Sequence, residues 1–377
     1  MPPCAKPRSN WGNPPWKIDF LPQPVPLPKE VDFAIVGGGF TGLAAAACLC
    51  RLMPGSPVVV LEAQCIGEGA SGRTGGLVLG ETAGGDLPAL GDVLAGFADI
   101  LGKLDVDGEI SLPGAWEIAR HAKPKAGSPI RWKDSGELRV VAEVPGGTID
   151  PGRLVSGLAG AAVRQGALII ENARVDAIEW RSPPTLELGG RRLRAGKILF
   201  ATNALSVALA GFDQSYEPRL TLAIRSAPLP EKQLEDLGLR ERKPFYTSDL
   251  PYLWGRVCRD NSIVWGAGLV SAPGSRDLYR ISIASEECSR LLGSLEARVH
   301  ALHPALRDVR ITHRWGGPIL FRESWLPAFG WHPKSRSALV LGAFAGHGVA
   351  LSSYLGAWAA EALVGRRELP AWGKLQA

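Results

Sequence analysis

A glycine-rich turn between a buried strand and a helix constrains this chain more than any other feature. Residues 31–36 (VDFAIV) are apolar enough for a buried strand, and Gly-Gly-Gly-Phe-Thr-Gly follows at 37–42, before a run of helix-forming alanines. A second strand-like run ends in Glu62, twenty positions after Gly42. This order of strand, glycines, helix, strand and acid predicts a dinucleotide-binding fold.

Each part of this motif has a physical task in holding a pyrophosphate. Gly37 allows the tight turn, Gly39 lets the backbone approach the phosphates, and Gly42 lets the helix pack closely on the strand. The helix N-terminus adds free N–H groups and a partial positive charge, and Glu62 can accept hydrogen bonds from two ribose hydroxyls. A plain glycine-rich turn with a solvated glutamate is the alternative. The predicted contacts are Gly37, Gly39, Phe40, Thr41, Gly42, Glu62 and Ala63.

A second glycine-rich loop, GASGRTGG, follows at 69–76. Small residues there let main-chain N–H groups face an anion or the edge of a flat ring. Together with the strand that ends in Glu62, this loop resembles the FAD-dependent D-amino-acid oxidase-like (DAO) superfamily, and within it the γ-glutamylputrescine oxidase-like amine oxidoreductases. Thr74 stands where that family usually has Asn, and an ordinary mobile loop is the alternative. The implied FAD contacts are Gly69, Ser71, Arg73, Thr74, Gly75 and Gly76.

Three later segments extend the resemblance over most of the chain. Residues 148–175 resemble the segment that passes the adenine, and residues 197–204 resemble the strand and turn that close the FAD domain. Residues 339–351 resemble the last strand and turn, where the next helix directs its N-terminus at the flavin pyrimidine and stabilises negative charge there. His347 is expected beside the flavin, the alternative being an ordinary surface or core histidine. The implied contacts are Val175, Ala201, Thr202, Gly346, His347, Gly348, Val349 and Ala350.

The chain has 377 residues, enough to bury a large core in two domains. The resemblance implies an α/β fold, with a Rossmann-like FAD-binding domain and a second substrate domain of mixed or antiparallel sheet. Nine prolines lie in residues 1–30, which predicts an extended arm that Trp11 and Trp16 pin to the body. A passive strap is expected, and a partner-binding arm is the alternative. The expected FAD-binding segments are 31–90, 148–210 and 336–377, and those of the substrate domain are 91–147 and 211–335.

The bulk composition excludes several other classes of protein. The net charge is only +5, and no dense Lys/Arg run is interleaved with aromatic residues, so nucleic-acid binding is not expected. The six cysteines include no C-x-x-C pair, so no metal site is expected, and free buried thiols suit a reducing cytoplasm. No uninterrupted apolar run has the length of a membrane span. The oligomeric state is not predicted.

Aromatic residues are the candidates for the substrate pocket. Tyr252 and Trp254 alternate along one predicted strand and would share a face, while Trp265 and Trp315 lie in neighbouring strand-like runs. Their rings could hold an amine by cation–π attraction, although each tryptophan could equally be a core residue. The candidate catalytic residues are His347, Tyr252, Trp254 and Trp315.

The family pattern breaks where amino-acid-specific relatives carry an arginine for the substrate carboxylate. Here residues 317–319 are Gly-Pro-Ile, and Arg322 could serve only if the strand is shifted. We therefore expect oxidation of the C–N bond of an amine, with hydride transfer to flavin N5 and an imine product that hydrolyses. No carboxylate is expected in this pocket. The alternatives are an α-amino- or imino-acid oxidase or dehydrogenase of the same fold, and a non-catalytic FAD-binding partner or sensor.

The sequence also bears on how FAD is attached and on which compound accepts the electrons. Related sarcosine oxidases attach FAD to a cysteine in the C-terminal part, whereas this chain has none after Cys288, so non-covalent FAD is expected. The acceptor is oxygen or another compound, and His347 or Arg256 could supply the cation that favours oxygen reduction.

Overall fold

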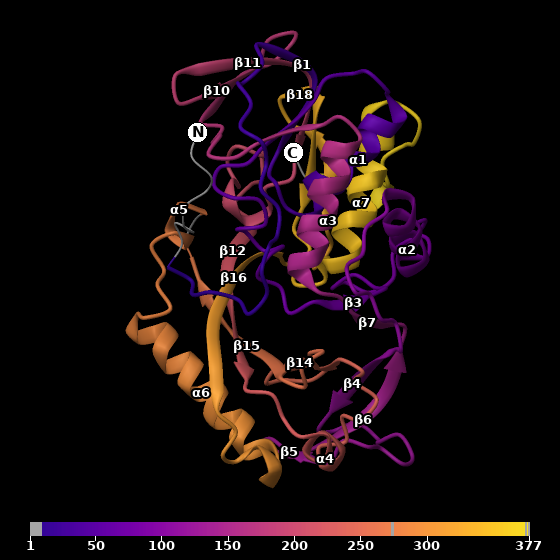
Figure 1. Cartoon of the computed structure of the whole chain (residues 1–377), viewed down its shortest axis with the longest axis vertical. Coiled ribbons are helices and arrows are strands. Elements are labelled where there is room, and N and C mark those ends of the chain that lie inside the picture. Colours follow the sequence, from indigo (N-terminus) through magenta and orange to yellow (C-terminus); the bar gives the residue numbers. More distant parts are fainter. Residues whose placement is uncertain (1–9, 273–274, 374, 376–377) are drawn as a thin grey trace.

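The computed structural model describes residues 10–272, 275–373 and 375, and it confirms the predicted α/β architecture. Two eight-stranded sheets form the two halves of the molecule. Between them lies a two-stranded sheet of β3 (Leu77–Leu79) and β7 (Gly146–Thr148), as Figure 1 shows.

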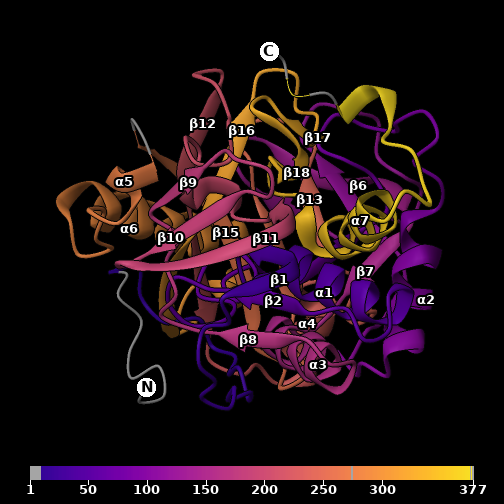
Figure 2. The ribbon, with the colours of Figure 1, turned by 90° about the horizontal axis from the view of Figure 1, so that it is seen from above.

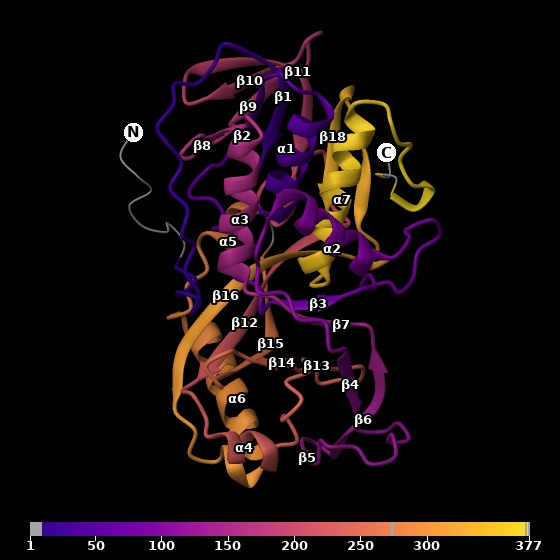
Figure 3. The ribbon, with the colours of Figure 1, turned by 45° about the vertical axis from the view of Figure 1, so that its right-hand side comes forward.

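The first sheet is mainly parallel and carries its helices on one face. Its strand order is β17-β18-β11-β1-β2-β8, with β10 and β9 extending from β11. Helices α1, α3 and α7 pack against it, and α2 lies beside α7 (Figure 3). The elements of this half are β1 (Glu30–Val36), α1 (Phe40–Leu52), β2 (Val58–Leu61), α2 (Val93–Leu104), α3 (Pro151–Arg164), β8 (Leu168–Ile170), β9 (Ala177–Glu179), β10 (Thr185–Leu188), β11 (Arg191–Phe200), β17 (Ala328–His332), β18 (Ser335–Gly342) and α7 (Gly348–Leu363).

Side-chain alternation in β1 explains why its whole sequence is apolar. Phe33 and Ile35 point to the helices, whereas Ala34 and Val36 join the core on the opposite face. A parallel strand covered on both faces needs apolar residues at successive positions.

The second sheet is mainly antiparallel, with the order β16-β12-β15-β14-β13-β4-β6-β5. Helix α6 packs on β12 and β15, and Figure 2 shows α5 and α6 on the side of the molecule away from α1, α3 and α7. The elements of this half are β4 (Ala115–Ala119), β5 (Trp132–Lys133), β6 (Glu137–Val144), β12 (Tyr216–Ser226), α4 (Glu231–Asp236), β13 (Phe245–Thr247), β14 (Trp254–Val257), β15 (Ile263–Ser271), α5 (Ser275–Leu278), α6 (Glu286–Leu302) and β16 (Ile311–Arg322).

Two elements pack with the first sheet, although the domain boundaries expected from the sequence assign them to the substrate domain. Helix α2 packs on α7, and β17 pairs antiparallel with β18 at the edge of the parallel sheet. The side chain of Asp92 caps α2 by accepting a hydrogen bond from the Ala95 N–H. The apolar face of α2, with Phe97 and Leu101 buried, is then covered by the first half of the molecule.

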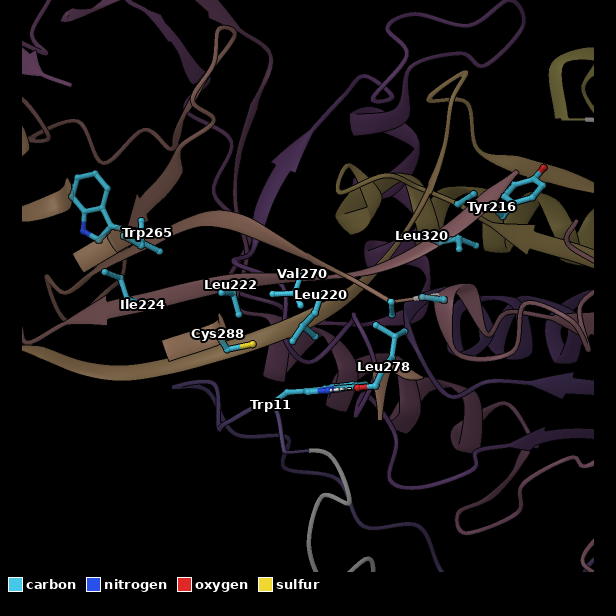
Figure 4. Packing of buried hydrophobic residues seen from close by; sticks show 14 of the residues in the cluster. Trp11, Tyr216, Leu220, Leu222, Ile224, Trp265, Val270, Leu278, Cys288 and Leu320 are labelled. Carbon is cyan, nitrogen blue, oxygen red and sulfur yellow. Dashed lines mark hydrogen bonds between the residues drawn. The ribbon is translucent and has the colours of Figure 1, made fainter. Parts of the chain in front are cut away.

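Residues 10–29, which we call the strap, cross the molecule before β1 without forming a helix or a strand. Trp11 is fully buried, and its Nε1 donates to the Leu278 carbonyl at 2.9 Å (Figure 4). Trp16 Nε1 donates to the Gly72 carbonyl at 2.6 Å. The two tryptophans therefore pin the strap to both halves, as predicted from the sequence.

The cysteines differ in state. Cys48, Cys50, Cys258 and Cys288 are free thiols, whereas Cys65 is disulfide-bonded, so the expectation of free thiols is wrong for Cys65. Burial raises the pKa of Cys48 and of Cys50 to about 11, which keeps both protonated. In the described residues, no helix combines the length and the apolar character that a membrane crossing requires.

Candidate active site

A cavity of about 2540 Å³ lies between the two sheets. Its nucleotide end is lined by both glycine-rich loops, by Glu62 and by Val175. Its substrate end is lined by strands of the second sheet and by the N-terminus of α7. The two loops that resemble an FAD site and the aromatic candidates therefore border one continuous space.

The backbone of the first loop leaves no room for side chains. Gly37 has φ +114°, and a Cβ there would lie 2.7 Å from the Ala201 carbonyl oxygen. A Cβ on Gly39 would lie 2.7 Å from Ser71 Oγ, and a Cβ on Gly42 would lie 2.0 Å from the Gly37 carbonyl oxygen. The glycines thus form a cradle in which main-chain atoms lie at the cavity surface, and this cradle fits a pyrophosphate.

Glu62 occupies the position expected for a ribose acceptor. Its carboxylate lies at the end of β2 and accepts from the Gly38 N–H at 2.8 Å and from the Gln64 N–H at 2.9 Å. Burial raises its pKa from the ordinary value of 4.5 to about 7, against the lowering effect of these two hydrogen bonds. A carboxylate has about four acceptor sites, so two remain for the hydroxyls of a ribose.

The second loop is held in place by Ser71 and Arg73. Ser71 Oγ accepts from the Phe40 N–H at 2.9 Å and so ties this loop to the start of α1. Arg73 is buried, and its guanidinium pairs with Glu68 at 2.7 Å and donates to the Gly12 carbonyl of the strap at 2.7 Å. Arg73 lines the cavity, but its charge is directed into the protein and supports the loop from behind.

Several buried polar atoms at the cavity have no hydrogen-bond partner in the described part of the chain. They are Thr202 Oγ1, His347 Nδ1 and Ser352 Oγ. All three residues line the cavity, with His347 at the N-cap of α7. Such atoms fit a polar cofactor that completes their hydrogen bonds, and the FAD assignment therefore agrees with the donors and acceptors present.

Most of the residues predicted to contact FAD line this cavity. Gly42, Gly76 and Ala350 do not, because the first and last are buried in helices and a Cβ on Gly76 would meet the Ile149 carbonyl oxygen at 2.4 Å. The residues that line it are Gly37, Gly39, Phe40, Thr41, Glu62, Ala63, Gly69, Ser71, Arg73, Thr74, Gly75, Val175, Ala201, Thr202, Gly346, His347, Gly348 and Val349.

A transverse row of the second sheet forms the wall opposite these loops. Strand register places six residues side by side on one face: Glu117, Tyr246, Trp254, Gly266, Ala223 and Trp315. The Trp254 ring covers Gly266 and reaches the second loop, since a Cβ on Gly75 would lie 2.1 Å from it. Trp315 Nε1 donates to the Arg73 carbonyl at 2.9 Å. The row thus joins the sheet to the cofactor loop.

Two of the aromatic candidates are placed differently from the prediction. Tyr252 lines the cavity but lies before β14 and not within it, and its carbonyl accepts a hydrogen bond from Arg298 at 2.8 Å. Trp265 does not line the cavity. Its ring is fully buried 5.4 Å from that of Trp132 and 5.1 Å from that of Phe245, so it is a core residue.

Sequence reasoning missed the carboxylates of this pocket. Glu81 and Glu117 both line the cavity, and the Tyr246 hydroxyl donates to Glu81 Oε1 at 3.1 Å. The expectation of a pocket without a carboxylate is therefore wrong. Glu81 follows β3 by two positions, and Glu117 lies in a strand that the sequence did not predict. A polar residue inside the apolar run Ala115–Ala119 was the available signal.

The cations near the substrate end are already paired. Arg298 lines the cavity, but its guanidinium contacts Asp134 at 2.6 Å. Arg322 lies over the Tyr216 ring, 5.3 Å from its centre, and does not line the cavity. In the parts of the chain that the structure describes, the strand positions opposite the loops are Gly317, Pro318 and Ile319, which offer no positive charge to a substrate carboxylate.

Trp325 stands at the cavity in the turn between β16 and β17. Its side chain is 48% exposed, and its backbone has φ +59°. The ring packs edge-on against Phe321 at 5.1 Å between ring centres. This turn thus places a bulky aromatic residue at the cavity rim.

The fold and the site define a two-domain flavoenzyme, and comparison with known proteins agrees. The FAD-dependent oxidoreductase (DAO) family matches residues 32–362, so the chain belongs to this family of FAD-dependent enzymes. It is 27% identical to gamma-glutamylputrescine oxidoreductase of Escherichia coli (strain K12), over 89% of this chain and 84% of that protein.

Solved structures share the fold at lower sequence identity. Glycine oxidase from Geobacillus kaustophilus has a TM-score of 0.69 and 20% identity, covering 93% of this chain and 99% of that one. L-Proline dehydrogenase from P. horikoshii has a TM-score of 0.70 and 18% identity, covering 92% and 96%.

Proposed function

We propose that this enzyme oxidises the C–N bond of an amine that carries no α-carboxylate. The observation that carries the proposal is the charge of the substrate end of the cavity. Glu81 and Glu117 line it, whereas Gly317, Pro318 and Ile319 occupy the strand that faces the cofactor loops. A substrate carboxylate would meet negative charge without a guanidinium partner, and burial of an unpaired charge is unfavourable by several kcal/mol.

Different residues of the cavity would bind the cofactor and the substrate. The loop glycines and Glu62 would hold FAD, which supplies the hydride acceptor, flavin N5, when it is bound. The N-terminus of α7 would stabilise negative charge on the pyrimidine side. Trp254 and Tyr252 would hold the apolar body of the amine. Neutral amine would lose hydride from its α-carbon, and water would then hydrolyse the imine product.

FAD is bound without a covalent bond to cysteine in this proposal. No cysteine lines the cavity among the described residues, and Cys258 and Cys288 are buried elsewhere. Acid precipitation of the purified yellow protein should release the flavin to the supernatant. A yellow pellet would contradict non-covalent binding but not the cofactor assignment, whereas a colourless protein that binds NAD would contradict both.

The substrate class is tested by following flavin bleaching without air. Butylamine and norvaline differ only by the carboxylate on the reacting carbon. Butylamine should reduce the flavin at least about a hundredfold more efficiently, as expected when a carboxylate lacks its partner. Faster reduction by norvaline, together with a KM for norvaline that rises in Arg322→Ala, would favour an amino-acid oxidoreductase instead.

The proposal also includes the electron acceptor and the cellular compartment of the enzyme. Reoxidation of the reduced enzyme by oxygen, compared with a quinone, identifies the acceptor. Arg256 does not line the cavity, and burial lowers the pKa of His347, so neither places a fixed cation at the cavity surface. We retain the cytoplasm as the expected compartment on the basis of the four free thiols, with the Cys65 disulfide as the exception.

A further inference from the structure

The acidic part of the cavity is built around Tyr246. Glu117 and Tyr246 are register partners across β4 and β13, so their side chains share the cavity face of the sheet. Glu81, which follows β3 and also lines the cavity, accepts a hydrogen bond from the Tyr246 hydroxyl at 3.1 Å. Both carboxylates therefore lie beside Tyr246.

Neither of these carboxylates has an ion-pair partner within the described chain. The salt bridges of the described residues involve other acids. Arg298 lines this end of the cavity, but it forms an ion pair with Asp134 and donates hydrogen bonds to main-chain carbonyls. Two carboxylates in a partly enclosed cavity attract a cation more strongly than they would in water. Among the residues that the structure describes, no cation forms an ion pair with either carboxylate.

The surroundings of the two acids also favour a cationic ligand. Tyr246, Tyr252 and Trp325 contribute ring surfaces to this end of the cavity, and aromatic faces attract ammonium groups. The buried Nδ1 of His347 lines the same space without a partner among the described residues, and it can accept a hydrogen bond from an N–H donor.

An ammonium held by two carboxylates cannot be the group that is oxidised. Loss of hydride from the α-carbon requires a neutral amine, whereas a nearby negative charge favours the protonated form. The acidic site therefore suits a second amino group of the same substrate, which remains charged while the first reacts.

On this basis we propose that Glu81 and Glu117 form a subsite for the distal ammonium of a diamine, so that the enzyme selects amines with a second positive charge. This inference rests on the proposed function and narrows its substrate class. Hydrogen bonds to charged groups are strong enough to change affinity about tenfold to a hundredfold.

The test compares putrescine with butylamine, which has the same carbon chain and one ammonium fewer. The dependence of anaerobic flavin reduction on concentration gives an apparent dissociation constant for each. We expect putrescine to bind at least about tenfold more tightly to the wild type. In Glu81→Gln and in Glu117→Gln the ratio of the two constants should fall towards one.

Glu137→Gln is the matched control, because Glu137 lies on β6 of the same sheet and is exposed and outside the cavity. It should keep the wild-type ratio. Flavin content and thermal unfolding of each variant show whether the protein is folded, and the double variant Glu81→Gln/Glu117→Gln should show no preference for putrescine.

The outcomes separate the two proposals. If both amines reduce the flavin with equal affinity, or if the variants keep the wild-type ratio, the diamine subsite is refuted while amine oxidation stands. If norvaline reduces the flavin and neither amine does, both proposals are refuted.

Discussion

The buried carboxyl of Glu62 makes the stability of the cofactor-free protein depend on pH. Its native pKa is about 7, whereas its ordinary value is 4.5. Because the native state binds this proton more tightly than the unfolded state, the contribution of Glu62 is fully present below pH 4.5 and is lost as the pH rises through 7. The difference corresponds to about 3 kcal/mol.

Glu62→Gln isolates this effect from the other titrating groups. The glutamine amide keeps the shape of the side chain but does not titrate, so its influence on the hydrogen bonds to Gly38 and Gln64 is the same at both pH values. Urea unfolding of the apoprotein at about pH 5 and about pH 8 should show the variant gaining about 2 to 3 kcal/mol relative to the wild type at the higher pH. An equal difference at both pH values would refute the reasoning.

The pH dependence of FAD affinity is an independent test of the protonation of Glu62. Ribose hydroxyls that donate to Glu62 favour its charged form, so FAD binding should release a proton. The affinity of the wild type should therefore increase as the pH rises through 7, whereas that of Glu62→Gln should not. Equal pH dependence of FAD affinity in both proteins would contradict a contact between Glu62 and the ribose.

Two further substitutions test the loops around the cofactor. Gly39→Val should abolish FAD binding because its side chain would fill the cradle, whereas Gly102→Ala, in a helix with open space at its Cβ, should bind FAD normally. Equilibrium dialysis with FAD measures both. Trp16→Phe should lose the hydrogen bond to the Gly72 carbonyl and weaken FAD binding by about 0.5 to 1.5 kcal/mol, and an unchanged affinity would show that the strap does not support the loop.

The nucleotide end of the cavity could be predicted because the residues that form it follow one another closely in the sequence. Strand, turn, helix and acid follow one another between residues 31 and 62, and the turn alone requires the glycines. The strap was predictable for the same reason, since its prolines exclude helix and central strand. Trp11 and Trp16 were then the side chains available to hold it.

The substrate end depends on long-range pairing and could not be predicted in this way. The row from Glu117 to Trp315 joins six strands, and β13 supplies Tyr246 from only three residues. Alternation cannot distinguish Trp254, which lines the cavity, from Trp265, which lies in the core. Only the packing of Trp132 and Phe245 around Trp265 decides between the two roles.

The strap sets an order on the assembly of this protein. Trp11 is synthesised before its hydrogen-bond partner Leu278, which lies 267 residues later in the chain. The Gly12 carbonyl, which holds Arg73 and so the second cofactor loop, belongs to the same segment. The strap of a nascent chain therefore cannot form this contact until residue 278 has been synthesised, and contacts of such sequence separation form slowly. We therefore expect the strap to support the second cofactor loop only after both halves of the molecule have been made.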